Sequence, residues 1–176
     1  SIREHIRGRS YKPQPGRRVE IPKPNASKRK LGIPTVMDRV IQQGIAQRIS
    51  PMCEPLFSDH SYRFRPNRSC EMAIKDMLMF LNEGYEWIVD IDLEKFFDNV
   101  SQDKLMSLDH NIINDGETES LIRKYLKAGV MEQGRYEKTE QGSPQGGNMT
   151  PLYSTIMLNE LDKELAGRGL GFVWYA

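Results

Sequence analysis

Two aspartates at the end of an apolar run are the residues of this chain best suited to chemistry. Residues 87–93 are rich in strand-forming side chains, and Asp90 and Asp92 lie two positions apart within them. Because side chains alternate along a strand, these two carboxylates would share one face of it. Buried carboxylates are costly unless a cation meets them, and hard divalent cations take carboxylate oxygens. The run therefore predicts either a metal site or an aspartate that pairs with Lys or Arg.

A glycine-rich turn further along the chain could bring backbone atoms close to a ligand. Residues 141–147 are rich in glycine, which permits such an approach because it has no side chain. Thr150 is expected to cap the helix that follows, with Pro151 as the first helical residue. A glycine pair before a helix is usually only a loop. Its position after the acidic run favours a ligand-binding turn instead.

Short strands and amphipathic helices must position these residues. Residues 18–22 and 30–33 are expected to form a hairpin joined by a polar loop. Thr35 and Ser69 are expected to cap helices whose apolar residues recur at helical spacing. The other expected elements are the strand over residues 87–93, a short helix after Ser101, a helix over 117–127, a hairpin over 131–139, a helix over 150–165 and a strand over 170–175.

Charge is distributed unevenly along the 176 residues, although the formal net charge is only +1. Residues 1–40 hold 11 Lys+Arg and 3 Asp+Glu, a net charge of +8, and the remainder has a net charge of −7. A basic N-terminal part beside an acidic remainder predicts a lobe that binds a polyanion, joined to a lobe that binds metal. The alternative is a basic arm that is merely solvated.

Cysteine usage and hydropathy limit the class of protein. Cys53 and Cys70 have neither zinc-ligand spacing nor the pattern of a disulfide framework, which favours a reducing cytoplasm. No apolar run approaches the length of a membrane span, so no membrane partner is expected. The first residue is Ser1, and residue 176 falls at the end of an expected strand. The chain is therefore expected to be a fragment of a longer protein.

Several blocks, taken in order, resemble the reverse transcriptases encoded by group II introns, which also act as maturases. The blocks are residues 19–24, 29–43, 57–69, the run that contains Asp92, and 143–147. The resemblance implies an α+β fold with reverse-transcriptase fingers at residues 1–84 and a partial right-hand palm at 85–176, an antiparallel sheet backed by helices. Two departures stand out. The chain stops at Ala176, where the family continues with an Asp-Asp pair, and Arg63 stands where the family often has glycine.

The same resemblance implies roles for individual residues. Asp92 would be the first catalytic carboxylate of the palm and, with the main-chain carbonyl of Leu93, a ligand of Mg²⁺. Phe97 would lie under the sugar of the incoming nucleotide and exclude a 2′-hydroxyl. The implied contacts to the deoxynucleoside triphosphate (dNTP) are Lys23 and Arg29 at the phosphates, and Gln145 and Gly146 beside the nucleotide.

A cluster of arginines interleaved with aromatic residues suits an RNA strand. Arg63, Arg65 and Arg68 alternate with Tyr62 and Phe64, so cations for phosphates lie beside rings for base stacking. The alternative is a turn held by cation–π contacts and ion pairs. The sequence leaves these two readings open.

The expected function is RNA-directed DNA polymerisation by the longer protein, with Mg²⁺, dNTPs, an RNA template and a DNA primer. The resemblance also implies binding to the parent intron RNA during splicing, in a bacterial cytoplasm, and it is compatible with a homodimer. A chain with one catalytic carboxylate is expected to be inactive alone. The alternatives are a non-catalytic RNA-binding fragment and a related bacterial reverse transcriptase from a non-intron system.

Overall fold

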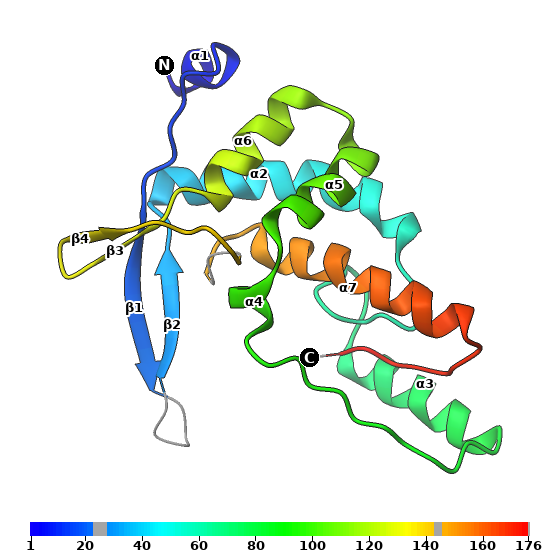
Figure 1. Cartoon of the computed structure of the whole chain (residues 1–176). Helices are drawn as coiled ribbons and strands as arrows, with labels where there is room; N and C mark the ends of the chain where they lie inside the picture. Colours follow the sequence, from blue (N-terminus) through cyan, green and yellow to red (C-terminus); the bar gives the residue numbers. More distant parts are fainter. Residues whose placement is uncertain (23–27, 143–145, 176) are drawn as a thin grey trace.

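A β-hairpin projects from a helical body in the computed structural model, which describes residues 1–22, 28–142 and 146–175 (Figure 1). The hairpin consists of β1 (Gly16–Pro22) and β2 (Lys28–Ile33), paired antiparallel as the sequence predicts. The residues between the two strands, 23–27, lie outside the described part of the chain.

A second hairpin extends the sheet. Strand β3 (Val130–Glu132) lies parallel to β1 and pairs antiparallel with β4 (Arg135–Glu137), giving the order β2-β1-β3-β4. Gln133 and Gly134 between them both have positive φ, the geometry that a two-residue turn needs to match the strand twist. The hairpin expected over residues 131–139 is therefore confirmed in a shorter form. The described sheet has one parallel pair, whereas an antiparallel sheet was predicted.

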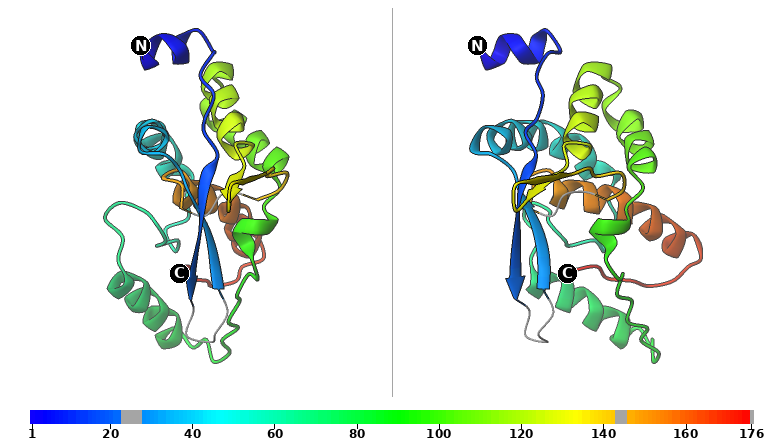
Figure 2. Two further views of the ribbon diagram at one scale, coloured as in Figure 1. Left: turned by 90° about the vertical axis from the view of Figure 1, so that its left-hand side faces the viewer. Right: turned by 60° about the vertical axis from the view of Figure 1, so that its left-hand side comes forward.

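Four helices enclose the core: α2 (Val36–Cys53), α5 (Gln102–Ile113), α6 (Gly116–Leu126) and α7 (Thr150–Gly167) (Figure 2). Each contributes apolar side chains that are almost completely buried, among them Ile49, Leu105, Ile122 and Ile156. The other helical segments are α1 (Ile2–Arg7), the single 3₁₀ turn η1 (Glu54–Leu56), α3 (Cys70–Asn82) and the short α4 (Phe96–Asn99). None of the helices in the described ranges is both long and apolar enough to cross a membrane.

Three helices begin at the caps that the sequence predicts, and one helix does not. The side chains of Thr35, Ser69 and Ser101 each accept a hydrogen bond from a backbone N–H in the first turn of the helix that follows. Helix α7 instead begins at Thr150 itself, so Thr150 is not its cap. Met149 precedes it with helical φ and ψ, and its side chain is buried in the core. The helix thus starts one residue earlier than predicted, with Met149 in the capping position.

The two strands expected in the palm are not formed in the described structure. Residues 85–93 carry no regular structure, and the Trp87 and Val89 side chains are 91% and 81% exposed. Residues 170–175 make a single bridge, between Trp174 and Ser61. A strand requires a neighbour that accepts and donates its backbone hydrogen bonds. Neither segment lies beside such a neighbour among the described strands, so local strand propensity is not sufficient.

A buried aspartate ties the N-terminal segment to the body. The carboxylate of Asp38, which is 1% exposed, accepts hydrogen bonds from the Tyr11 hydroxyl (2.8 Å), the Gln14 N–H (3.2 Å) and the Thr35 hydroxyl (2.6 Å). Three donors compensate the cost of burying this charge. Residues 11–14 are thereby held at the start of α2, which sets the position from which β1 leaves the body.

Asp109 on α5 is buried without such compensation. Its side chain is completely buried, and neither carboxylate oxygen has a hydrogen-bond partner among the described residues. Burial, with a smaller contribution from Glu119 on α6, raises its pKa from 3.8 to about 7. Burial raises the pKa values of Cys53 on α2 and Tyr153 on α7, and Asp109 adds to both shifts. The core therefore favours the neutral, protonated carboxyl group.

We expect Asp109 to make the stability of the protein fall as pH rises. A folded-state pKa above the unfolded value means that the stabilisation is complete below pH 3.8 and is lost as pH rises towards 7. Asp109→Asn should remove this dependence and raise the free energy of unfolding at pH 8, by up to about 4 kcal/mol. Urea unfolding between pH 4 and pH 8 measures the effect. Asp103→Asn, on the exposed side of the same helix, is the control, and an unchanged pH profile in the Asp109 variant would contradict the expectation.

Candidate nucleotide and nucleic-acid site

A cavity of about 250 Å³ lies between the β1–β2 hairpin and the short helix α4. Arg18 of β1 and Lys30 of β2 line one side, and Phe97 and Asp98 of α4 line another. Val130 of β3 and residues 137–142, from the last residue of β4 onwards, also line it. The cavity therefore combines cations and an aromatic ring, which could receive a nucleoside triphosphate, with the carboxylates of Asp98, Glu137 and Glu140.

Hairpin register explains why these two cations share the cavity. Arg18 pairs with Gly32, and Glu20 pairs with Lys30, so Arg18 and Lys30 lie on the same face of the two strands. Arg29 is exposed and lies on the other face, because neighbouring side chains alternate. Lys28 forms an ion pair with Glu20 at 2.6 Å. Lys30 was not among the predicted site residues, and the structure places it in the cavity wall.

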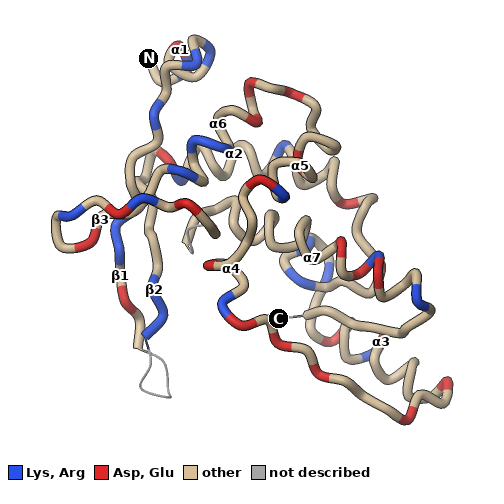
Figure 3. Tube along the Cα trace, viewed as in Figure 1, with Lys and Arg blue, Asp and Glu red and all other residues tan. Residues whose placement is uncertain are grey.

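Arg18 also has acidic neighbours. Its guanidinium lies 3.8 Å from Glu132 and 3.5 Å from Glu137, carboxylates of the β3–β4 hairpin. Its Nε is buried and has no hydrogen-bond partner in the part of the chain that the structure describes. Figure 3 shows Lys and Arg along both strands of the β1–β2 hairpin. Arg18 was not among the predicted site residues, although strand alternation applied to residues 18–33 could have identified it.

The glycine-rich loop is held at its first end by α4 and α5. Gly142 donates its N–H to the Val100 carbonyl at 2.8 Å, and its carbonyl accepts a hydrogen bond from the buried Gln102 amide at 2.9 Å. Gly142 has a φ of +78°, and a Cβ at this position would lie 2.5 Å from the Phe97 carbonyl oxygen. Only glycine permits this approach. The loop is thus fixed directly against the helix that carries Phe97.

The second end of the loop is held by β2 and α2. A Cβ on Gly146, which has a φ of +110°, would lie 3.4 Å from the Gly32 carbonyl oxygen of β2. Asn148 donates its backbone N–H to the Gln42 side-chain oxygen at 2.9 Å and its side-chain amide to Gln43 at 3.0 Å. The predicted nucleotide contact Gln145 lies outside the described residues, between an end that lines the cavity at Gly142 and an end that is held by β2 and α2.

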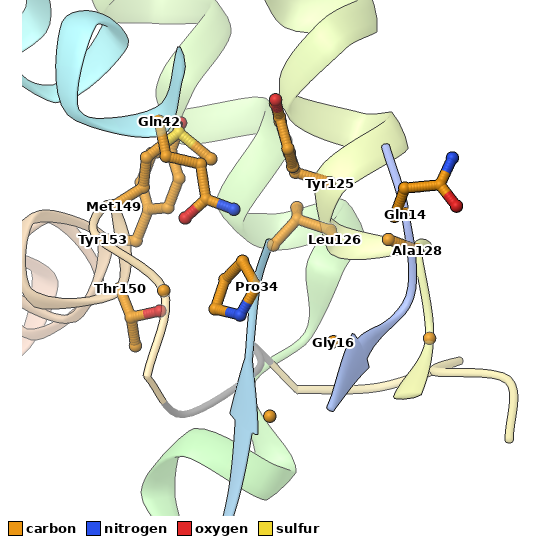
Figure 4. A pocket seen from close by; sticks show the side chains of 13 residues that line it. Gln14, Gly16, Pro34, Gln42, Tyr125, Leu126, Ala128, Met149, Thr150 and Tyr153 are labelled. Carbon is orange, nitrogen blue, oxygen red and sulfur yellow. Dashed lines mark hydrogen bonds between the residues drawn. The ribbon is translucent and has the colours of Figure 1, made fainter. Parts of the chain in front are cut away.

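A smaller cavity lies behind this loop, at the junction of the hairpin with the helices (Figure 4). Gln42, Tyr125, Met149 and Tyr153 are among the side chains that surround it. Its volume of about 30 Å³ is comparable with that of one water molecule. This cavity is therefore a small gap where the packed elements meet, and it is too small for a nucleotide.

Arg63 approaches the ring that the sequence analysis assigned to the sugar. Its Cζ lies 5.8 Å from the Phe97 ring centroid and 4.9 Å from that of Phe64. Burial lowers the pKa of Arg63, and its Nε has no hydrogen-bond partner among the described groups. Phe97 is half-buried, with the Phe96 ring 5.4 Å away. Arg63 is thus the member of the arginine cluster that lies beside Phe97.

The other two arginines are engaged within the turn. The Arg65 side chain is 3% exposed, donates to the Glu54 carboxylate at 2.7 and 3.0 Å, and donates to the Ser61 and Ser58 carbonyls. Arg68 donates to the Asp59 carboxylate at 2.8 Å and lies over the Tyr62 ring at 5.3 Å. Of the two readings that the sequence left open, these contacts favour the ion-paired turn for Arg65 and Arg68. Their predicted contact with RNA stays a prediction.

Asp92 lies in the exposed, extended segment that leads into α4, as do Asp90 and Leu93. Its carboxylate is the kind of hard oxygen ligand that Mg²⁺ takes. Within residues 1–22, 28–142 and 146–175, no group of three or more His, Cys, Asp or Glu side chains could hold a metal ion. The described residues therefore supply part of a metal site at most. Lys23, the other predicted phosphate contact, lies outside them.

Comparison with known proteins identifies the family. The profile of the family described as "Reverse transcriptase (RNA-dependent DNA polymerase)" matches residues 21–176. The group II intron-encoded protein LtrA of Lactococcus lactis subsp. cremoris is 42% identical over 163 residues, which are 92% of this chain and 27% of LtrA. Protein YkfC of Escherichia coli is 38% identical over 173 residues, which are 96% of this chain and 45% of YkfC.

More distant relatives agree with this result. An uncharacterized 91 kDa protein in the cob intron of Schizosaccharomyces pombe is 34% identical over 92% of this chain and 20% of its own length. Among solved structures, a chain of a partial Cas6-RT-Cas1–Cas2 complex superposes with a TM-score of 0.55 at 19% identity, over 98% of this chain and 30% of that chain. That likeness shows the fold alone. The chain spans less than half the length of each of these curated relatives.

The resemblance drawn from the sequence blocks and the α+β fold class are both confirmed by these matches. The chain belongs to the reverse transcriptase (RNA-dependent DNA polymerase) family, and group II intron-encoded proteins are among its relatives.

Proposed function

We propose that the protein containing this chain is an RNA-directed DNA polymerase encoded by a group II intron, and that the cavity beside α4 receives the incoming dNTP. The observation that carries the proposal is the meeting of three features in one cavity. These are two cations on one face of the hairpin, the half-buried Phe97 ring, and the first end of the glycine loop, Gln141 and Gly142, which Gln102 holds in place. Family membership supports the reaction class.

The cations would bind the triphosphate of the nucleotide, and the ring would contact its sugar. Arg18 and Lys30 line the cavity and would face the triphosphate, where charge-assisted hydrogen bonds are strong. Arg29 and Lys23 remain proposed contacts that would approach from the hairpin tip. Phe97 would lie under the sugar, with Gln145 and Gly146 positioning the nucleotide from the glycine loop. Arg63, whose guanidinium lies over the Phe97 ring, would help to hold that ring in place.

Asp92 and the Leu93 carbonyl would contribute ligands to a Mg²⁺ site. The chemistry that Mg²⁺ supplies when bound is charge neutralisation on phosphates and activation of the primer 3′-oxygen. Asp92 fits this role because its carboxylate is exposed on the segment that enters α4, on the approach to Phe97. The remaining ligands would have to come from outside the described residues.

The proposed macromolecular partners are an RNA template with a DNA primer and, as in a maturase, the parent intron RNA. We propose fingers at residues 1–84 and a partial palm at 85–176 by homology with the family. These two parts are not separate folding units. The sheet and the core run across residue 84, because β1 pairs with β3 and α2 packs with α5 and α7. A bacterial cytoplasm and a homodimer are further parts of the proposal.

One observation favours a second candidate for the chain in isolation, which is RNA binding without catalysis. Since the described residues contain no complete metal site, the 176-residue chain should bind RNA but should not extend a primer. Template-dependent incorporation of labelled dNTP by the purified chain measures this. Measurable synthesis would contradict the expectation and would show that the chain is catalytically sufficient.

Asp92→Asn in the intact protein should lower primer extension by several orders of magnitude, because the substitution keeps the shape of the side chain and removes its charge. RNA affinity should change little. Asp90→Asn is the matched control, as it removes a charge from the same exposed segment and should have a much smaller effect. Single-turnover extension rates compare the two. Near-normal extension by the Asp92 variant would remove this residue from the proposed site.

Phe97→Val should open space beside the sugar and admit a 2′-hydroxyl. The ratio of ribonucleotide to deoxynucleotide incorporation should rise about tenfold to a hundredfold. Phe96→Val is the control, because Phe96 packs against the core and should affect stability more than sugar selection. The measurement is kcat/KM for each nucleotide. An equal ratio in the parent and the Phe97 variant, or the same rise in both variants, would refute the assignment.

A further inference from the structure

A basic groove of about 560 Å³ lies on another face of the molecule, between the N-terminal segment, α6 and the β3–β4 hairpin. Lys12 lines it from the N-terminal segment, and Arg123, Lys124 and the C-cap residue Lys127 line it from α6. These α6 positions recur at helical spacing, so their side chains share one face of the helix. The lining contains no acidic residue among the described part of the chain.

The walls of this groove are held in place by hydrogen bonds. Lys124 donates its ammonium protons to the carbonyls of Arg9 (2.8 Å) and Tyr11 (3.2 Å), which binds the N-terminal segment to α6. The Tyr11 hydroxyl is itself bound to Asp38. Figure 2 shows this segment running alongside α6 towards β1. The groove is therefore formed by fixed elements that are distant in the sequence.

The other cations of the groove are available to a ligand. Lys12 and Lys127 are exposed, and neither has an ion-pair partner within the described ranges. Arg123 pairs with Asp103 at 3.0 Å, but the two side chains are 44% and 92% exposed, and such surface pairs contribute little. A phosphate could therefore replace Asp103 at Arg123 at small cost.

Tyr136 adds an aromatic surface to these charges. Its side chain is 54% exposed, and its ring lies against Gly129, where a Cβ would come within 2.6 Å of a ring carbon. The backbone of Gly129 thus fixes the ring while leaving about half of the residue open. Tyr136 pairs with Met131, whereas its neighbour Glu137 approaches Arg18 of the nucleotide cavity. The two sites therefore use opposite faces of the β3–β4 hairpin.

We propose that this groove is a second nucleic-acid site, which binds a single-stranded segment of RNA with phosphates at Lys12, Arg123 and Lys127 and one base stacked on Tyr136. Cations beside an exposed ring are the combination by which proteins hold single strands without reading sequence. The site rests on the proposed function only in taking RNA as the ligand. Its position lets the protein hold one RNA segment while a nucleotide occupies the cavity beside α4.

The test measures binding of a fluorescently labelled single-stranded RNA of mixed sequence to the 176-residue chain, by anisotropy over a range of salt concentrations. The variant Lys12→Glu with Lys127→Glu should bind more weakly, and the slope of log K against log salt should become shallower by about 0.7 for each lost phosphate contact. The matched control is Lys104→Glu with Lys163→Glu, which makes the same charge change at exposed positions of α5 and α7. The control should keep the slope of the parent.

Tyr136 separates stacking from general attraction of anions. Tyr136→Ala should weaken RNA binding about fivefold to a hundredfold, whereas Tyr136→Phe should bind like the parent. Equal slopes in the groove and control variants would overturn the proposal. A second pair of results would also overturn it. If Tyr136→Ala bound RNA like the parent, and if the lysine variant lost heparin binding as much as RNA binding, the groove would be an unspecific polyanion surface.

Primer extension by the intact protein distinguishes this inference from the proposed function. On a template too short to reach the groove, the Lys12 and Lys127 variant should extend at the rate of the parent. If groove variants bind RNA like the parent while Asp92→Asn abolishes extension, only the groove assignment is wrong. If the groove variants lose RNA and Asp92→Asn still extends a primer, the groove stands and the assigned catalytic carboxylate is wrong.

Discussion

Two buried glutamine side chains hold the glycine loop on which the candidate site depends. Gln102, at the start of α5, donates to the carbonyls of Gly142 and Leu126, and Gln42 of α2 accepts from the N–H of Asn148. Both amides are more than nine-tenths buried, where an unpaired polar group would be costly. The two described ends of the loop are therefore fixed where they satisfy these amides. This brings the loop against α4 at one end and β2 at the other.

Burial of charge organises the rest of the molecule in a similar way. Asp38 is acceptable in the core because three donors reach it, and those donors secure the N-terminal segment to α2. Arg65 is acceptable because Glu54 and two carbonyls surround its guanidinium. Asp109 has no such partners among the described residues, so its burial raises its pKa and favours its neutral form. Compensated charges thus fix geometry, whereas the uncompensated one makes stability depend on pH.

The β3–β4 hairpin connects the two proposed binding surfaces. One face presents Glu132 and Glu137 to Arg18, and the other presents Tyr136 to the basic groove. The hairpin also pairs with β1, so its orientation is tied to the hairpin that carries Lys30. A shift of either hairpin would alter both surfaces together. This shared element couples the proposed nucleotide cavity to the proposed RNA groove.

The sequence by itself determined the family, the β1–β2 hairpin and the helix starts at Thr35, Ser69 and Ser101, because each depends on a few neighbouring residues. Tertiary structure alone decided the rest. Arg65 could be assigned to the turn only once Glu54 was seen beside it, and Lys30 to the cavity only once β2 faced α4. Residues 87–93 have strand propensity, yet they form no strand among the described residues. A ladder requires a partner distant in sequence, and local propensity cannot supply one.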